Sequence, residues 1–203
     1  MPFVSLEGID GSGKTEQAGR LVGRLRGSGQ NVLATKEPDG GHIGAEVRSI
    51  LTRAGRVLSA TEQLLLVSAA RYDHVRSVIA PALARGAWVV SDRFRDSTYA
   101  FQVVGSDMAL EPLFKEVNSV VVGSIMPDVT IILDLPVEVA MARRSRRAQE
   151  NEDPSEAIRD FRSIRTGLLD LAAREPQRCR VVDGGQDPDQ VADAIWREVS
   201  TSV

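Results

Sequence analysis

Five short runs of apolar residues recur along the chain, and each is followed by a stretch in which apolar residues return at helical spacing. Short apolar runs bounded by turn residues are typical of buried strands, and their alternation with helices predicts a parallel sheet with helices on both faces. The fold class is therefore α/β, a three-layer α/β/α sandwich around a five-stranded sheet. The predicted strands are Phe3–Leu6, Val32–Thr35, Trp88–Ser91, Thr130–Leu135 and Arg180–Val182.

The predicted helices have recognisable starts and stops. Pro136, Ser155 and Pro188 stand where helices should begin, because proline suits the first turn and serine caps it. Pro81 lies inside a long helical pattern, which we expect it to bend or divide. The predicted helices are Lys14–Arg26, Ile43–Arg53, Thr61–Arg85, Leu110–Gly123, Pro136–Gln149, Ser155–Arg174 and Pro188–Ser200.

The composition is that of an ordinary globular domain. The chain has 203 residues, of which 42% are hydrophobic and 26% charged, and this length predicts one domain spanning residues 1–203. Twenty-five basic and 28 acidic side chains leave a net charge of −3, so no general attraction to nucleic acid is expected. Any affinity for phosphate has to be local.

Cysteine usage and the first residues bear on location. Cys179 is the only cysteine, so neither an intramolecular disulfide nor a cysteine metal cluster can form. It lies next to a predicted strand, where a packed core thiol is favoured over a reactive one. The first residues carry no basic leader, and no apolar run reaches the length of a membrane span. We expect a cytoplasmic protein with no membrane partner.

The strongest chemical signal is a P-loop at residues 8–15, with the sequence Gly-Ile-Asp-Gly-Ser-Gly-Lys-Thr. A predicted strand precedes it and a predicted helix follows, so backbone N–H groups and the helix N-terminus can face a polyphosphate. Lys14 would reach the β- and γ-phosphates, and the Thr15 hydroxyl would bind Mg²⁺. The expected ATP-phosphate site is Gly8, Ile9, Asp10, Gly11, Ser12, Gly13, Lys14 and Thr15.

A second signal closes the third predicted strand, which ends in Asp92-Arg93. An aspartate at the carboxyl end of a strand beside the P-loop can orient Mg²⁺, and an arginine one residue later can clamp a phosphate. Asp134 also ends a strand, but no cation follows it. We therefore favour Asp92 over Asp134 as the metal residue and interpret Asp134 as a helix-capping or structural carboxylate.

A basic cluster, Arg143–Arg147, abuts the acidic segment Gln149–Asp153. It fits either a solvated helix end or an arginine-bearing flap that closes during phosphoryl transfer. Gly11 gives the P-loop no basic residue of its own, which favours the flap, and we place this lid at about residues 143–155. No Asn-Lys-x-Asp motif occurs, which weighs against a GTPase switch.

Taken together, these segments resemble the bacterial thymidylate kinase (dTMP kinase) family over nearly the whole chain. Besides the P-loop, Lys36–Gly41 is similar to the Arg-Glu-Pro-Gly-Gly-Thr segment of that family, and Ala69–Arg71 to its Ala-Ala-Arg. Asp92–Gln102 resembles the signature that begins Asp-Arg-Tyr. The resemblance implies a P-loop kinase fold with strand order 2-3-1-4-5 and a homodimer.

The resemblance also implies roles for individual residues. Asp10 would bind the deoxyribose 3′-hydroxyl, while Arg93, and more weakly Arg48, would hold the acceptor phosphate. Arg71 would approach the carbonyl edge of the base, and Phe101 would wall off the sugar unless it is simply a core aromatic. The implied catalytic residues are Lys14, Arg93, Arg143, Arg147 and Asp10, and the implied acceptor site is Asp10, Arg48, Val67, Arg71, Arg93, Ser97, Phe101 and Gln102.

Several positions depart from the family pattern. Val67 stands where a phenylalanine usually stacks on the base, Asp39 where glycine is usual, and Gly41 where threonine is usual. The Asp-Arg pair of the lid falls on Asn151-Glu152, and Leu168 replaces a tyrosine. These changes bear on base selectivity more than on phosphoryl transfer.

The expected activity is ATP- and Mg²⁺-dependent phosphorylation of dTMP to dTDP, a step of dTTP biosynthesis. The main alternative is a kinase for another pyrimidine deoxynucleoside monophosphate, such as dUMP or a base-modified analogue. A P-loop ATPase or a nucleotide-switched binding module is a third interpretation, against which Arg71, Arg93 and Gln102 count.

Overall fold

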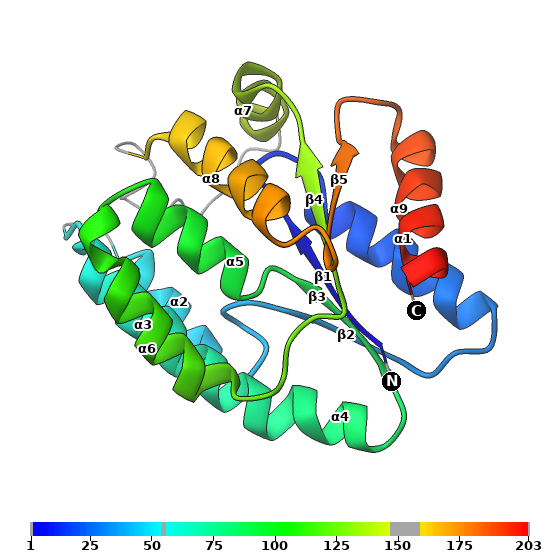
Figure 1. Ribbon diagram of the computed structural model, residues 1–203, viewed down its shortest axis with the longest axis horizontal. Helices are drawn as coiled ribbons and strands as arrows, with labels where there is room; N and C mark the ends of the chain where they lie inside the picture. The colour runs from blue at the N-terminus through cyan, green and yellow to red at the C-terminus, as the bar shows by residue number, and fades with distance from the viewer. Residues whose placement is uncertain (1, 54–55, 147–158, 203) are drawn as a thin grey trace.

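The strands of the computed structural model follow the predicted pattern. It describes residues 2–53, 56–146 and 159–202, and within them five parallel strands form one sheet in the order β2-β3-β1-β4-β5 (Figure 1). Each predicted strand is confirmed to within one residue at each end. The strands are β1 (Phe3–Glu7), β2 (Val32–Lys36), β3 (Trp88–Asp92), β4 (Val129–Asp134) and β5 (Cys179–Asp183).

Helices cover both faces of the sheet. The described α-helices are α1 (Lys14–Gly27), α2 (Gly44–Leu51), α3 (Ala60–His74), α4 (Ala80–Ala84), α5 (Arg95–Thr98), α6 (Glu111–Val122), α7 (Val137–Ser145), α8 (Phe161–Arg174) and α9 (Pro188–Ser202). Two π-helical segments, η1 (Val75–Ile79) and η2 (Tyr99–Val104), and one 3₁₀ turn, η3 (Met108–Leu110), join them. Among the described helices, none is long and apolar enough to cross a membrane.

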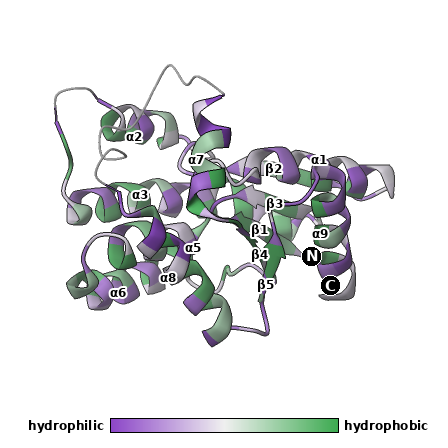
Figure 2. Cartoon of the chain, turned by 90° about the horizontal axis from the view of Figure 1, so that it is seen from above, coloured by the Kyte–Doolittle hydropathy of each residue, from purple (hydrophilic) through white to green (hydrophobic). Residues whose placement is uncertain are grey.

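Alternate residues of the central strands face opposite layers. Val4 and Leu6 of β1 pack with the apolar sides of α1 and α9, which lie side by side in Figure 1, whereas Phe3 packs on the other face. That face carries α4, α8 and η2 among others. β4 is coloured mainly as hydrophobic in Figure 2, as expected of a strand covered on both sides.

The long helical pattern around Pro81 is divided, as expected, but the change of geometry begins before the proline. The α-helical part α3 ends at His74, five residues of π-helix follow, and Pro81 occupies the first turn of α4. Proline lacks an N–H and its ring crowds the carbonyl one turn earlier, so widening of that turn removes the conflict.

The predicted start of the helix near Ser155 is partly wrong. Ser155 lies outside the described residues, but Arg159 and Asp160 are described and are not helical, and α8 begins at Phe161. The reason is local, because the Asp160 carboxylate accepts hydrogen bonds from the backbone N–H groups of Arg162 and Ser163. Asp160 therefore caps the helix and sets its start.

Candidate active site

The P-loop connects the end of β1 to the start of α1, as its sequence predicted. Gly11 adopts φ +83°, and a Cβ atom at this position would lie 2.0 Å from the backbone oxygen of Ala140. Only glycine fits this conformation at this distance. Gly13 caps α1 with φ 93°, which leaves the first N–H groups of the helix to face the loop. The loop can therefore hold an anionic polyphosphate.

Lys14 folds back onto the loop. Its Nζ donates to the Ile9 carbonyl at 2.8 Å and to Ser12 Oγ at 3.4 Å, and its side chain is buried. Burial and the neighbouring charge of Arg93 lower the pKa of Lys14 to about 8. A phosphate in the loop would offer this ammonium group a charged partner in place of a neutral carbonyl.

Thr15 and Asp92 form the pair expected of a magnesium site. The Thr15 hydroxyl donates to Asp92 Oδ2 at 2.5 Å, while Asp92 Oδ1 is buried and accepts no hydrogen bond from any described residue. A buried carboxylate oxygen without a partner, beside a hydroxyl, suits a hard cation that keeps most of its water and phosphate ligands. Asp134 instead binds Arg165 through two bonds of 2.6 and 2.9 Å, as a structural carboxylate would.

Arg93 links the P-loop to the neighbouring strand end. Its guanidinium forms an ion pair with Asp10 and donates to Ser97 Oγ at 2.9 Å and to the Gly8 carbonyl at 3.4 Å. Burial raises the pKa of Asp10, but the charges of Arg93, Lys14 and Arg159 outweigh it and hold that pKa below its usual value. Asp10 and Arg93 therefore meet as an ionised pair between the two expected phosphate positions.

The backbone of Arg93 is held in an unusual conformation. Its φ of 73° lies in the left-handed region, which is costly for a residue other than glycine. The Arg93 N–H donates to the Leu6 carbonyl at 3.0 Å, and the Ser91 hydroxyl donates to the Arg93 carbonyl at 2.7 Å. The Phe94 N–H donates to Glu7 Oε1 at 2.8 Å. These bonds aim the guanidinium at the P-loop.

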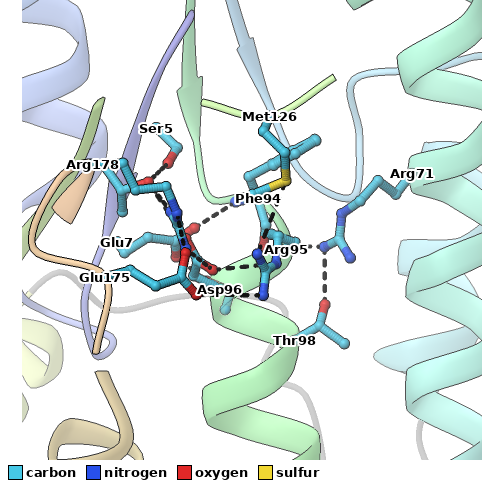
Figure 3. Close-up of polar contacts among 12 residues, drawn as sticks. Ser5, Glu7, Arg71, Phe94, Arg95, Asp96, Thr98, Met126, Glu175 and Arg178 are labelled. Atoms are coloured by element: carbon cyan, nitrogen blue, oxygen red, sulfur yellow. Dashed lines mark hydrogen bonds and ion pairs between the residues drawn. The ribbon is translucent and has the colours of Figure 1, made fainter. Parts of the chain in front are cut away.

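Glu7 belongs to a buried polar network beneath this turn (Figure 3). The Ser97 hydroxyl donates to Glu7 Oε2 at 2.5 Å. Arg178 donates two hydrogen bonds to the neighbouring Asp96 carboxylate, at 2.6 and 2.9 Å. Burial, together with the charge of Asp96, raises the pKa of Glu7 to about 8. Glu7 therefore keeps its proton to a higher pH than an ordinary glutamate, and it lies one hydrogen bond away from Ser97 and two from Arg93.

One cavity of about 160 Å³ adjoins the P-loop and collects the expected acceptor residues. All eight line it, although they come from the P-loop, α2, α3, the turn after β3, α5 and η2. Those eight are Asp10, Arg48, Val67, Arg71, Arg93, Ser97, Phe101 and Gln102; Glu37, Pro38, Leu51, Thr52, Gln63, Thr98 and Arg159 complete the lining. Phe101 is the one aromatic residue among these described lining residues.

Arg71 is fixed by partners that the sequence did not indicate. Its Nε and Nη2 donate to Glu37 Oε2 at 2.8 and 2.5 Å, and Nη2 also donates to the Phe94 carbonyl and Thr98 Oγ1. The other carboxylate oxygen of Glu37 lies 3.3 Å from His74 Nδ1. Glu37 is part of the segment that resembles the family, but no spacing rule pairs it with Arg71, 34 residues later.

Arg159 and Gln63 are further cavity residues that the sequence did not indicate. Arg159 lies beside the P-loop. It lies 3.6 Å from Asp10 Oδ2, and its guanidinium carbon is 5.2 Å from the ring centroid of Phe101, against which Arg93 also packs at 4.9 Å. Two arginines thus flank the same carboxylate and the same aromatic ring. The only signal in the sequence was the position of Arg159 just after the expected lid.

The structure also explains two departures from the family pattern. Asp39 binds Arg48 at 2.6 Å and Lys36 at 3.0 Å, so it restrains a side chain of the acceptor cavity. Gly41 lies against α3, where a Cβ atom would be 2.4 Å from Asp73 Oδ2 and 2.9 Å from the backbone nitrogen of His74. A threonine does not fit at position 41 unless α3 or this loop moves.

Of the two arginines expected in the lid, the structure describes Arg143 but not Arg147. Arg143 donates to the carbonyls of Gly184 and Gly185 at 2.7 and 3.3 Å and lines a pocket beside the outer side of the P-loop, away from the acceptor cavity. Arg147 and most of the segment 143–155 lie outside the described residues. Arg143 therefore borders the donor side, and the role of Arg147 stays a prediction.

Comparisons with known proteins agree over nearly the full length of the chain. The family model described as Thymidylate kinase matches residues 6–195. The chain is 43% identical to a thymidylate kinase of Rhodopseudomonas palustris (strain TIE-1), with 97% of this chain and 87% of that protein covered. It is 38% identical to the Deinococcus radiodurans thymidylate kinase, with 98% and 96% covered.

A solved structure gives the same result for the fold. The crystal structure of thymidylate kinase from Ehrlichia chaffeensis superposes with a TM-score of 0.76 at 29% identity, and 98% of each chain is covered.

Proposed function

The chain belongs to the thymidylate kinase family, and from this premise we propose how its residues divide the transfer of a phosphoryl group from ATP to dTMP. The enzyme is an ATP-dependent dTMP kinase. An oxygen of the dTMP phosphate forms a bond to the γ-phosphorus of ATP as the bond to the β-phosphate oxygen breaks, which yields dTDP and ADP. The acceptor oxygen is already a nucleophile, so positioning and charge carry the rate.

The donor side is the P-loop. Its N–H groups and the N-terminus of α1 would hold the β- and γ-phosphates, and Lys14 would leave the Ile9 carbonyl for them. Thr15 and the unpaired Oδ1 of Asp92 would hold Mg²⁺, which neutralises charge on the phosphates when bound. Arg143 would border the donor from its other side.

One observation carries the acceptor assignment: eight residues from six segments line a single cavity next to the P-loop. The Arg93 guanidinium lies at the end nearest Asp10, where it can hold the acceptor phosphate against the donor. Asp10 would bind the 3′-hydroxyl, while Arg71 and Gln102 would contact the base. Phe101 packs against two guanidinium groups, and it would exclude a 2′-hydroxyl by its bulk.

The transition state gathers negative charge between donor and acceptor, and two described arginines lie there. Arg93 and Arg159 both reach Asp10, although they lie far apart in the sequence. We assign Arg159 to stabilising this charge with Arg93, and Arg147 stays the predicted contribution of the lid. We further propose a single domain over residues 1–203 with the lid at 143–155; a cytoplasmic location stays a prediction.

An ADP-release assay across acceptors tests this function. With ATP and Mg²⁺, dTMP should give the highest kcat/KM among dTMP, dUMP, dCMP and UMP, and EDTA should abolish turnover. ATP hydrolysis that no monophosphate accelerates would indicate an ATPase. Turnover with dUMP but not dTMP would move the enzyme to another pyrimidine acceptor.

A further inference from the structure

Two glutamine side chains meet at one side of the acceptor cavity. Gln63 lies in the first turns of α3 and Gln102 in η2, and both are buried, with 8% and 7% of their surface exposed. Gln102 Nε2 donates to Gln63 Oε1 at 3.1 Å, and Gln63 Nε2 donates to the Leu58 carbonyl at 3.0 Å. Ser59 caps α3 in a reciprocal box with Glu62, which fixes the helix end that carries Gln63.

The Leu58 carbonyl determines which way the side-chain amides of Gln63 and Gln102 are oriented. A backbone carbonyl only accepts, so the Gln63 nitrogen has to face Leu58 and the Gln63 oxygen has to face Gln102. Gln102 must then donate through its nitrogen. Its Oε1 accepts no hydrogen bond from any described residue and is not among the buried unpaired atoms, so it is open to the cavity that Gln102 lines.

Arg71 presents the opposite polarity to the same cavity. Gln63, Val67 and Arg71 are four residues apart and share one face of α3, and all three line the cavity. Glu37, Phe94 and Thr98 engage Nε and Nη2 of Arg71, whereas Nη1 makes no hydrogen bond with a described residue and is not among the buried unpaired atoms. Arg71 thus offers the cavity a donor, and Gln102 offers it an acceptor.

We propose that Gln63 is a positioning residue that selects the class of acceptor base, by holding Gln102 so that its oxygen faces the base. The inference rests on the proposed function, because it requires the base to bind in this cavity. Thymine and uracil present a carbonyl acceptor at C4 beside an N3–H donor, which complements Arg71 and Gln102. Cytosine presents an amino donor beside an N3 acceptor, so both contacts are mismatched. The site therefore takes 4-keto pyrimidines and rejects 4-amino pyrimidines.

The test compares kcat/KM for dTMP and dCMP in Gln63→Met and Gln63→Glu. Methionine keeps the unbranched shape but neither hydrogen bond, so the Gln102 amide can rotate and offer its nitrogen to cytosine. We expect the ratio of kcat/KM for dTMP to that for dCMP to fall about tenfold or more. A protonated carboxyl group keeps both contacts, because its O–H can donate to the Leu58 carbonyl while its other oxygen accepts from Gln102, so Gln63→Glu should keep the ratio within about threefold of the parent.

Two further measurements separate this role from a packing effect. The KM for ATP should be unchanged in both variants, and in a Gln102→Met background Gln63→Met should no longer alter the ratio. If Gln63→Met does not fold, the ratio of kcat/KM for dTMP to that for dCMP is compared in Gln63→Glu and Gln102→Met instead. A ratio that falls in Gln63→Glu overturns the proposal. A ratio that stays unchanged in Gln102→Met also overturns it. An unchanged ratio in a folded Gln63→Met also overturns it. Absence of turnover of dTMP by the parent would overturn the proposed function instead.

Discussion

Arg159 reaches the P-loop only because the fold brings the segment before α8 close to Asp10. It precedes the cap of α8, and its guanidinium reaches Asp10, which lies in the P-loop 149 positions earlier. Its long side chain packs against Phe101, so the charge is held by an aromatic face as well as by the carboxylate. A cation in this position can act on charge that develops between the two phosphates.

Arg159→Ala is expected to lower kcat/KM for dTMP by a factor on the order of 10–10², because it removes one of the two cations at Asp10. Arg159→Lys should lose less, since the charge remains but the planar fork does not. Steady-state kinetics with saturating ATP check this. Arg162→Ala, which removes an exposed arginine paired with Glu138, is the control and should stay within about twofold. A loss of less than threefold in Arg159→Ala would leave the transition-state charge to Arg93 and the lid.

At the scale of elements, the carboxyl ends of β1 and β3 form a unit with α5. Glu7 closes β1, accepts from the backbone after Arg93, and reaches Ser97 in α5. Glu7 does not line the acceptor cavity, so we expect it to act by holding the turn that carries Arg93 (Figure 3). The raised pKa of Glu7 makes the stability of the folded protein depend on pH in a measurable way.

A carboxyl group with a raised pKa in the folded state makes the protein less stable as pH rises. The unfolded chain releases the Glu7 proton near pH 4.5, the ordinary pKa of a glutamate side chain, whereas the folded chain keeps it up to about pH 8. The stabilisation is thus fully present below pH 4.5 and is lost progressively towards pH 8. Glutamine reproduces the protonated side chain and does not titrate, so the Tm of Glu7→Gln relative to the parent should increase between about pH 5 and pH 8.

Thermal unfolding at about pH 5, 6, 7 and 8 measures this difference, and we expect it to grow by several degrees. Glu16→Gln, at an exposed position of α1, is the matched control and should show a constant difference. A constant Tm difference for Glu7→Gln would mean that Glu7 is ionised in the folded protein.

At the scale of the molecule, the net charge of −3 conceals a separation of charge. Lys14, Arg71, Arg93 and Arg159 converge on one end of the sheet, where the strands finish, although they lie far apart in sequence. Exposed apolar residues gather elsewhere. Leu65 and Tyr72 are 48% and 42% exposed and lie seven residues apart on one face of α3, and Val120 of the adjacent α6 is 73% exposed.

We expect these apolar residues to lie in the interface of the predicted homodimer. Leu65→Arg should therefore shift the mass measured by light scattering at micromolar concentration from dimer towards monomer, because a buried unpaired charge opposes association. Val181→Arg changes an equally exposed apolar residue of β5 and should leave the mass unchanged. A monomeric parent, or a dimer that survives Leu65→Arg, would remove this face from the interface.

The sequence by itself determined the elements whose signals are local. Short apolar runs indicated all five strands, and the spacing of Gly8, Gly11, Gly13 and Lys14 indicated the P-loop, because both patterns depend on neighbours within a few residues. The resemblance to a known family added the strand order and the residues of the acceptor cavity. It could not say which of those residues restrain one another.

The tertiary structure alone decided the partners. Three pairs from separate segments meet because β2, β3, β1 and β4 lie side by side in the sheet. They are Glu37 with Arg71, Gln63 with Gln102, and Arg159 with Asp10. No periodicity encodes such contacts, since the direction and distance of each side chain depend on how whole elements pack. Local patterns therefore predicted where the phosphates bind, and long-range packing supplied the contacts on which the proposal for selection of the acceptor base rests.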